Sequence, residues 1–161
     1  MFRILAAFLA LAALAAATLL GSGASAQSPA GRTLNFTELE KGATFKHIRN
    51  TKTKSTRANS AGDVIVSTNP VADAAGQVIG KSHNSCVTTV GARNFLKSTV
   101  TCQGVLVLRD GTLTAQFTFK VGAASVAGAV TGGTGTYANA RGVFVTKTDR
   151  RGQHDTITLV N

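Results

Sequence analysis

Alternation of apolar and polar residues is the dominant pattern of this chain. Over residues 112–121 apolar side chains occupy every second position, and threonine, glutamine or lysine fills the positions between them. Leu34 and Phe36 alternate with Thr33, Asn35 and Thr37 in the same way, after a start near Arg32. A period of two is typical of a β-strand with one buried face. Both stretches are therefore predicted to be half-buried strands.

Other stretches have strand composition and lie between turn-forming residues: 63–68, 77–90, 95–108, 126–130, 142–145 and 152–160. Pro70 is expected to end the first of these, because proline cannot donate a ladder hydrogen bond. No stretch after residue 26 shows a sustained helical stripe. Short strands with regular turn signals predict an all-β domain, either an antiparallel sandwich or a barrel.

Two segments add detail to this prediction. Residues 105–108 form a continuous apolar run, which indicates burial on both faces, one against the core and the other against a neighbouring subunit. Asp110-Gly111 then predicts a hairpin turn.

A glycine-rich connection between 126–130 and 142–145 is expected to be a corner of the sheet. Gly132, Gly133 and Gly135 can take positive φ, so they allow the chain to reverse. Phosphate-binding loops are also rich in glycine, but they need a following helix or a Gly-Lys-Ser/Thr sequence. Neither is present, so we do not expect a phosphate-binding loop here.

The N-terminus has the pattern of a secretory signal. Arg3 precedes an apolar run over residues 4–20, and Ala24-Ser25-Ala26 resembles a cleavage site. A membrane anchor is the alternative, but the run is short and has no basic flank after it. We expect residues 1–26 to be a signal peptide, 27–31 a flexible leader and 32–161 a single domain, secreted or periplasmic.

The charge balance is strongly basic, with 17 Lys and Arg against 7 Asp and Glu and a formal net charge of +10. Six of these cations lie close together, with no acid among them: Lys41, Lys46, Arg49, Lys52, Lys54 and Arg57. They predict either a solvated loop that protects a sheet edge or a site for an anionic cell-surface polymer. Secretion and the scarcity of interleaved aromatic residues argue against nucleic acid.

The chain has two cysteines, Cys86 and Cys102, which flank a turn predicted at residues 91–94. They can face each other across an antiparallel pair, and an exported protein meets an oxidising environment. A disulfide is therefore predicted. The alternative is a free reactive thiol at Cys86, which needs an environment that lowers its pKa.

Signs of catalysis are few. The three histidines, His47, His83 and His154, have no metal-ligand spacing, so we expect neither a metal nor a cofactor. Glu38 and Glu40 share one face near the end of the first strand, where we expect both to be solvated rather than a catalytic pair.

Three motifs carry a family resemblance: NSAGDVIV from Asn59 onward, GQVIGKSHNSCVTTV from Gly76 onward, and AVTGGTGTYANARG in the glycine-rich corner. Together they resemble the allene oxide cyclase barrel and the related dirigent proteins over residues 33–160. The resemblance implies a closed, calycin-like antiparallel β-barrel of about eight strands, with a possible homotrimer as its assembly. It also implies a hydrophobic small-molecule ligand, with cyclisation or stereoselective coupling as an isomerase-type activity that needs no metal.

Matched by motif, Asn59 and Cys86 fall where plant allene oxide cyclases have an asparagine and a cysteine lining the cavity. Asn35 and Thr37 stand where those enzymes have an acid and a second asparagine, and no tyrosine lies between residues 117 and 131. Tyr137 belongs to the corner motif and is interpreted as a packing residue. These departures favour an alternative: a non-catalytic binding protein that contacts anionic polymers through the basic stretch.

Overall fold

Nine antiparallel strands and two short 3-10 helices form the regular structure of residues 31–50, 59–150 and 152–160, which the computed structural model describes. The predicted signal peptide, residues 1–26, and nearly all of the leader lie outside these residues. The elements in chain order are β1 (Thr33–Glu38), β2 (Thr44–Ile48), β3 (Val64–Ala72), β4 (Val78–Val90), η1 (Phe95–Lys97), β5 (Thr99–Leu108), β6 (Gly111–Lys120), β7 (Ser125–Gly133), η2 (Gly135–Tyr137), β8 (Arg141–Asp149) and β9 (Gly152–Val160).

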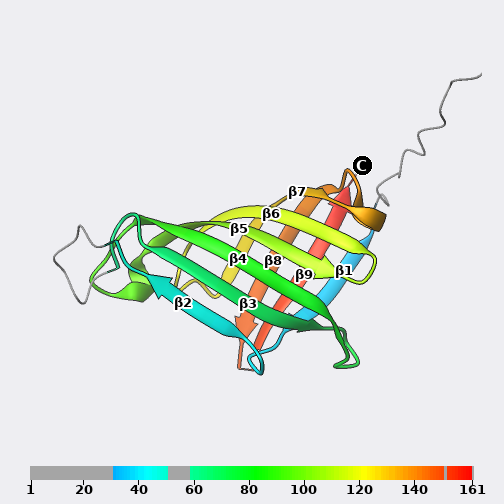
Figure 1. Ribbon diagram of the computed structural model, residues 1–161, viewed down its shortest axis with the longest axis horizontal. Coiled ribbons are helices and arrows are strands. Elements are labelled where there is room, and N and C mark those ends of the chain that lie inside the picture. The colour runs from blue at the N-terminus through cyan, green and yellow to red at the C-terminus, as the bar shows by residue number, and fades with distance from the viewer. Residues whose placement is uncertain (1–30, 51–58, 151, 161) are drawn as a thin grey trace, which may run out of the picture.

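Eight of the strands close into a barrel. The order is β1-β9-β8-β7-β6-β5-β4-β3, and β1 returns to pair with β3 at Thr37↔Ala72 and Glu38↔Val71. Figure 1 shows β3 to β6 on one side of the barrel, with β8, β9 and β1 crossing behind them. The prediction of an all-β, closed antiparallel barrel of about eight strands is confirmed. The ninth strand, β2, lies outside the closed barrel and pairs with β3.

The prediction that Pro70 ends its strand is wrong, since β3 continues to Ala72. Along one edge β3 pairs first with β2 and then, from Val71, with β1. Pro70 lies at this change of partner, where its carbonyl oxygen accepts the N–H of Leu39 at 2.9 Å. The N–H and C=O groups of one strand residue point to the same edge of the strand. The N–H that proline lacks would therefore point into the gap between β2 and β1.

Two further local predictions need correction. The interpretation of the basic stretch as loop is wrong for Thr44–Ile48, which forms β2 with mostly exposed side chains. The strand predicted from residue 95 begins only at Thr99, because Phe95–Lys97 is a 3-10 turn. The side chain of Asn94 caps that turn by accepting the N–H of Leu96 at 3.0 Å.

The glycine-rich corner is present, but only one of its three named glycines has positive φ. Gly135 has φ 60°, whereas Gly132 and Gly133 lie within β7. Gly133 instead allows the backbone of Tyr137 to pack closely against β7, because a Cβ at residue 133 would lie 2.3 Å from the carbonyl oxygen of Tyr137. The corner therefore folds back onto β7 with no room for a larger residue.

Alternation along β6 is confirmed, with Leu113 buried and Lys120 exposed. The apolar run in β5 alternates as well: Leu106 is 6% exposed, but Val107 is 39% exposed. Within one chain this run is therefore buried on one face only. A subunit covering the other face stays a prediction.

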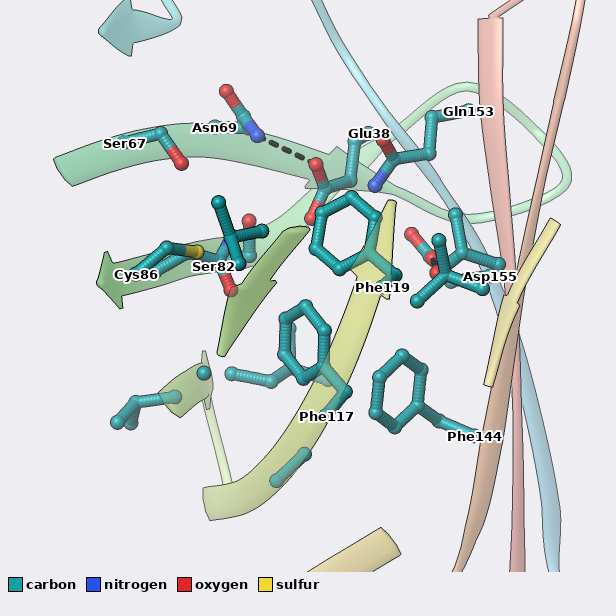
Figure 2. A pocket seen from close by; sticks show the side chains of 18 of the residues that line it. Glu38, Ser67, Asn69, Ser82, Cys86, Phe117, Phe119, Phe144, Gln153 and Asp155 are labelled. Atoms are coloured by element: carbon teal, nitrogen blue, oxygen red, sulfur yellow. Dashed lines mark hydrogen bonds between the residues drawn. The ribbon is translucent and has the colours of Figure 1, made fainter. Parts of the chain in front are cut away.

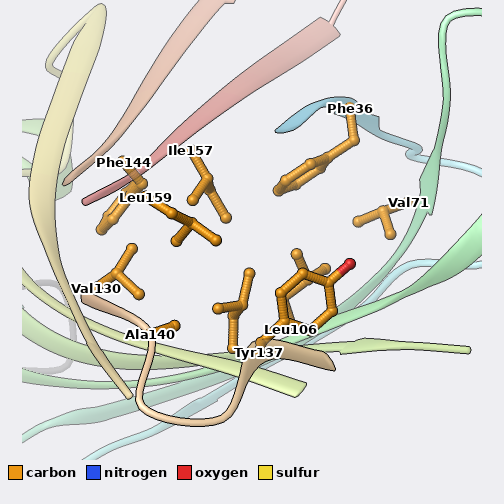
Figure 3. Packing of buried hydrophobic residues seen from close by; sticks show 10 residues of the cluster. Phe36, Val71, Leu106, Val130, Tyr137, Ala140, Phe144, Ile157 and Leu159 are labelled. Carbon is orange, nitrogen blue, oxygen red and sulfur yellow. The ribbon is translucent and has the colours of Figure 1, made fainter. Parts of the chain in front are cut away.

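One end of the barrel is filled by a cluster of buried apolar side chains (Figure 3), made up of Phe36, Val71, Leu106, Leu113, Val130, Tyr137, Ala140, Phe144, Ile157 and Leu159. Tyr137, from η2, is 2% exposed, and its hydroxyl donates a long hydrogen bond of 3.4 Å to Asp110. These contacts agree with its interpretation as a packing residue. The corner segment thus closes the barrel at this end.

Within the part of the chain that the structure describes, no helix has both the length and the apolar character needed to cross a membrane.

Candidate active site

A cavity of about 300 Å³ occupies the barrel beyond the filled end. Its rim includes Phe45, Ala123 and Thr148, which are exposed, so the cavity opens toward the turns after β6 and β8. Its volume lies at the lower limit of sites for drug-sized ligands. Most of its wall is apolar, with contributions from Phe36, Ile65, Cys86, Phe95, Val100, Leu106, Leu113, Ala115, Phe117, Phe119, Val121, Val126, Val130, Phe144 and Ile157.

Phenylalanine rings form a large part of this wall. Phe117 and Phe144 meet edge to face with ring centroids 4.9 Å apart, and Phe117 and Phe119 stack at 5.7 Å. Gly128 makes the edge-to-face contact of Phe117 with Phe144 possible, because a Cβ at residue 128 would lie 2.4 Å from the ring of Phe144 and 2.6 Å from Cβ of Phe117. Such rings offer flat apolar faces to a planar ligand.

Two carboxyl groups enter this apolar space from adjacent strands. Glu38 is the last residue of β1 and follows Phe36 on the inner face, while Asp155 precedes Ile157 on the inner face of β9. Figure 2 shows Glu38 and Asp155 in the upper part of the cavity and the rings of Phe117 and Phe144 below them. The cavity is therefore apolar along most of its wall and acidic at one place.

Glu38 accepts a hydrogen bond from a neighbouring strand. The side-chain amide of Asn69, on β3, donates to its carboxyl group at 2.5 Å, as Figure 2 shows. Burial raises the pKa of Glu38 above its usual value, and the Ser82 hydroxyl and the Asn69 amide oppose this rise. Both donors favour the ionised form of Glu38.

Asp155 has fewer partners. It is 6% exposed and accepts a short hydrogen bond from the hydroxyl of Thr146 through Oδ1. Its other oxygen, Oδ2, has no hydrogen-bond partner of good geometry among the described residues. Burial raises the pKa of Asp155 to about 7 and the negative charge of Glu38 adds to the rise, whereas Thr146, Gln153 and His154 oppose it. At neutral pH both protonation states of Asp155 are populated.

The two residues matched by family motif lie in different places. Cys86 lines the cavity and is disulfide-bonded to Cys102 across β4 and β5, with Cα atoms 4.0 Å apart, so the predicted bridge is present. Asn59 is buried at 4% exposure, accepts the Thr88 hydroxyl at 3.3 Å and is not among the cavity-lining residues. A ligand-binding role for Asn59 stays a prediction.

The positions that match plant active-site residues on β1 also point away from the cavity. Asn35 is exposed and accepts the hydroxyl of Thr156 at 3.0 Å. Thr37 contacts His154 at 3.2 Å. The expectation that Glu38 is solvated is wrong, because it lies within the barrel, whereas Glu40 follows the strand and is exposed.

A second polar cluster surrounds Asp63, just before β3. This carboxylate accepts the N–H groups of Asn50 and Ser60 at 2.7 and 3.0 Å and contacts His47 at 3.1 Å. Burial favours a higher pKa for Asp63, but these donors outweigh burial and lower the pKa. Asp63 thereby ties the end of β2 to β3, and this cluster lies outside the cavity lining.

The basic stretch is described only in part. Lys41, Lys46 and Arg49 are exposed and do not line the cavity. Lys52, Lys54 and Arg57 lie outside the described residues. Contact with an anionic polymer through these side chains stays a prediction. Across the described ranges, no group of three or more His, Cys, Asp or Glu side chains is placed to hold a metal ion.

Sequence reasoning missed the acidic pair, although one signal was available. Ile157 and Leu159 share one face of the last strand, and Asp155 is two residues before Ile157, so alternation assigns Asp155 to the same buried face. A buried aspartate on that face is a candidate functional residue.

No protein-family model matches the sequence, and no curated protein matches it either. Solved structures do resemble the barrel. A pyocyanin demethylase is 18% identical, with a TM-score of 0.63 over 80% of this chain and 100% of that chain. The Diels-Alderase AbmU from Streptomyces koyangensis is 14% identical, with a TM-score of 0.58 over 85% of this chain and 73% of that chain.

A third structure, the pterocarpan synthase dirigent protein GePTS1, is 14% identical, with a TM-score of 0.57 over 84% of this chain and 88% of that chain. At these identities the likeness concerns the fold. The expected resemblance is confirmed for the barrel fold, which a dirigent protein shares.

Proposed function

We propose that this barrel binds a largely apolar, ring-containing small molecule in its cavity and directs its isomerisation or cyclisation by proton transfer. The observation that carries the proposal is the pair of carboxyl groups, Glu38 and Asp155, within an otherwise apolar, phenylalanine-lined cavity. Structures with this fold include a pyocyanin demethylase, a Diels-Alderase and a pterocarpan synthase dirigent protein, which supports a small organic molecule as the ligand.

The surroundings of the two carboxyl groups assign them different roles. Burial raises the pKa of both groups, but the negative charge of Glu38 adds to the rise at Asp155, so Glu38 ionises first and is the base. Asp155 has a pKa of about 7 and keeps its proton in part at neutral pH, so Asp155 is the acid. Two neighbouring carboxyl groups whose environments separate their pKa values can act as base and acid in one site.

The proposed step conserves the composition of the ligand. Glu38 removes a proton from a weakly acidic C–H or O–H group, and the released electron pair forms the new bond within the ligand. Asp155 gives its proton to the oxygen at the other end of the conjugated system, which receives the displaced π electrons. One proton leaves and one arrives, so the product is an isomer of the substrate. Exchange with water returns both carboxyl groups to their starting states.

The cavity contributes through shape as well as acid–base chemistry. Its rings restrict a flexible ligand to few conformers, and a near-attack conformer raises the rate of ring closure. The apolar wall also excludes water, which strengthens each proton-transfer contact.

Export is part of the proposal. The disulfide between Cys86 and Cys102 supports an oxidising compartment, as does the signal-like pattern of residues 1–26.

A base in a dry cavity can be tested with 5-nitrobenzisoxazole, a compact aromatic probe. Glu38 removes the proton at C3 of the isoxazole ring, and the released electron pair forms a nitrile. The N–O bond breaks, and the oxygen keeps its electron pair as a coloured phenolate. We expect saturable product formation above the buffer rate. Replacing Glu38 by glutamine is expected to lower that rate on the order of 100-fold, the usual contribution of a positioned base.

Glu40→Gln is the matched control, because Glu40 lies two residues away and is exposed. It is expected to retain the parent rate. The proposal is overturned if product forms no faster than in buffer, or if the Glu38 and Glu40 variants react alike.

A further inference from the structure

Charge is unevenly distributed between the surface and the cavity. The chain carries a formal net charge of +10, yet no lysine, arginine or histidine is present among the described residues that line the cavity. The two charged groups in that lining are the carboxyl groups of Glu38 and Asp155. A ligand in the cavity therefore meets negative charge and no protein cation.

A bound carboxylate or phosphate is disfavoured by this arrangement. Such a group would lose its hydration in an apolar cavity and gain two like charges as neighbours, with no cation to compensate them. A neutral ligand leaves the half-buried Glu38 and the buried Asp155 without a compensating charge. A bound cation supplies the missing positive charge and favours ionisation of both carboxyl groups.

The phenylalanine rings of the cavity are a second feature that attracts a cation. The faces of aromatic rings carry partial negative charge and attract cations, most strongly where water is excluded. Phe117, Phe119 and Phe144 line the same cavity as the two acids. Asp155 supplies the independent sign of a missing partner, because it is 94% buried and its Oδ2 has no hydrogen-bond partner of good geometry among the described residues.

We infer that the ligand of this cavity is a flat aromatic molecule that carries a basic or quaternary nitrogen. This inference rests on the proposed function and narrows its substrate class. For a ligand with a basic ring nitrogen, the proton of Asp155 goes to that nitrogen instead of to an oxygen, and the two groups form an ion pair. A quaternary nitrogen displaces that proton to solvent, so such a ligand binds but cannot use Asp155 as an acid. Fatty acids and other anionic amphiphiles are rejected.

Three-ring probes test this directly: 10-methylacridinium as the cation, anthracene as an uncharged ring system of nearly the same size and anthracene-2-carboxylate as the anion. Fluorescence titration at pH 8 is expected to give at least tenfold tighter binding of the cation than of anthracene, and no measurable binding of the anion. Since the net charge of the protein repels a cation, such a preference must come from the cavity.

The pH dependence separates this site from surface binding. Asp155 shares the cavity with Glu38 on β1, the uncharged Thr146 on β8 and Gln153 on its own strand. His154, its neighbour in sequence, acts on it only through its charge. Binding of 10-methylacridinium is expected to tighten as the pH rises from 5 to 8, because Asp155 loses its proton over that range. Binding of anthracene is expected to lack this increase.

Asp155→Asn keeps the shape of the side chain and its acceptor for Thr146. This variant is expected to bind 10-methylacridinium about tenfold more weakly and anthracene unchanged, and Glu40→Gln is expected to match the parent. If anthracene binds as tightly as the cation and Asp155→Asn changes neither, this inference is overturned while the proposed function stands. If no probe binds and 5-nitrobenzisoxazole does not react, the proposed function fails as well.

Discussion

Replacing Asp155 by asparagine is expected to make the protein more stable at pH 8, by on the order of 2–4 kcal/mol. The folded state raises the pKa of this carboxyl group from 3.8 to about 7. Ionising it above pH 4 is therefore easier in the unfolded chain than in the barrel. Stability falls as the pH rises through this interval and levels off above pH 7, and a shift of roughly 3 pH units corresponds to about 4 kcal/mol.

The asparagine variant removes the ionisation but keeps an acceptor for Thr146. Urea denaturation at pH 4 and pH 8 measures the effect, with a large gain in unfolding free energy at pH 8 and little change at pH 4. Glu40→Gln serves as the control, because an exposed glutamate is expected to change stability by less than about 0.5 kcal/mol. An asparagine variant that is equally destabilised at both pH values contradicts the burial assigned to Asp155.

Removing the disulfide is expected to lower the unfolding free energy by about 3 kcal/mol, the value predicted for a loop of this length from chain entropy. Cys86 and Cys102 are 16 residues apart, directly opposite on β4 and β5, and both are buried. They pack in a second apolar cluster with Ile65 and Val100 that lines the cavity. The bridge therefore constrains the unfolded chain and one wall of the candidate site.

Denaturation of the double variant Cys86→Ala/Cys102→Ala, with and without dithiothreitol, measures this contribution. The parent protein is expected to lose stability in the reductant, and the double variant is expected to be insensitive to it. Equal stability of the parent protein with and without reductant, under conditions where free thiols are detected, speaks against the bridge as a source of stability.

The strands and the disulfide could be predicted because their signals are local. Alternation along residues 112–121 assigns each side chain of β6 to a face without knowledge of the rest of the chain. The short turn between β4 and β5 similarly brings Cys86 opposite Cys102. The prediction that Pro70 ends its strand is wrong because the effect of a proline depends on which strand lies at each edge of β3. Those neighbours are set by the whole barrel and not by the local sequence.

The candidate site could not be predicted from local signals, because it exists only once the barrel has closed. Glu38 and Asp155 lie near opposite ends of the chain and meet only because β1 pairs with β9. Alternation assigns Glu38 and Glu40 to the same face only if the strand continues through both residues. In the structure, β1 ends at Glu38. Glu38 is therefore inside the barrel and Glu40 in solvent, a distinction that depends on the position of one strand end.

The protonation state of Asp155 is the measurement that tests the central claim most directly. Carbon-13 NMR of the protein labelled at aspartate carboxyl carbons, titrated from pH 3 to pH 9, follows each group separately, and the spectrum of Asp155→Asn assigns the signal. A midpoint near 7 is predicted, because this carboxyl group is buried in an apolar cavity beside Glu38. A midpoint below about 5, within the ordinary range of exposed aspartates, would contradict the acidic pair and the proton transfer assigned to it.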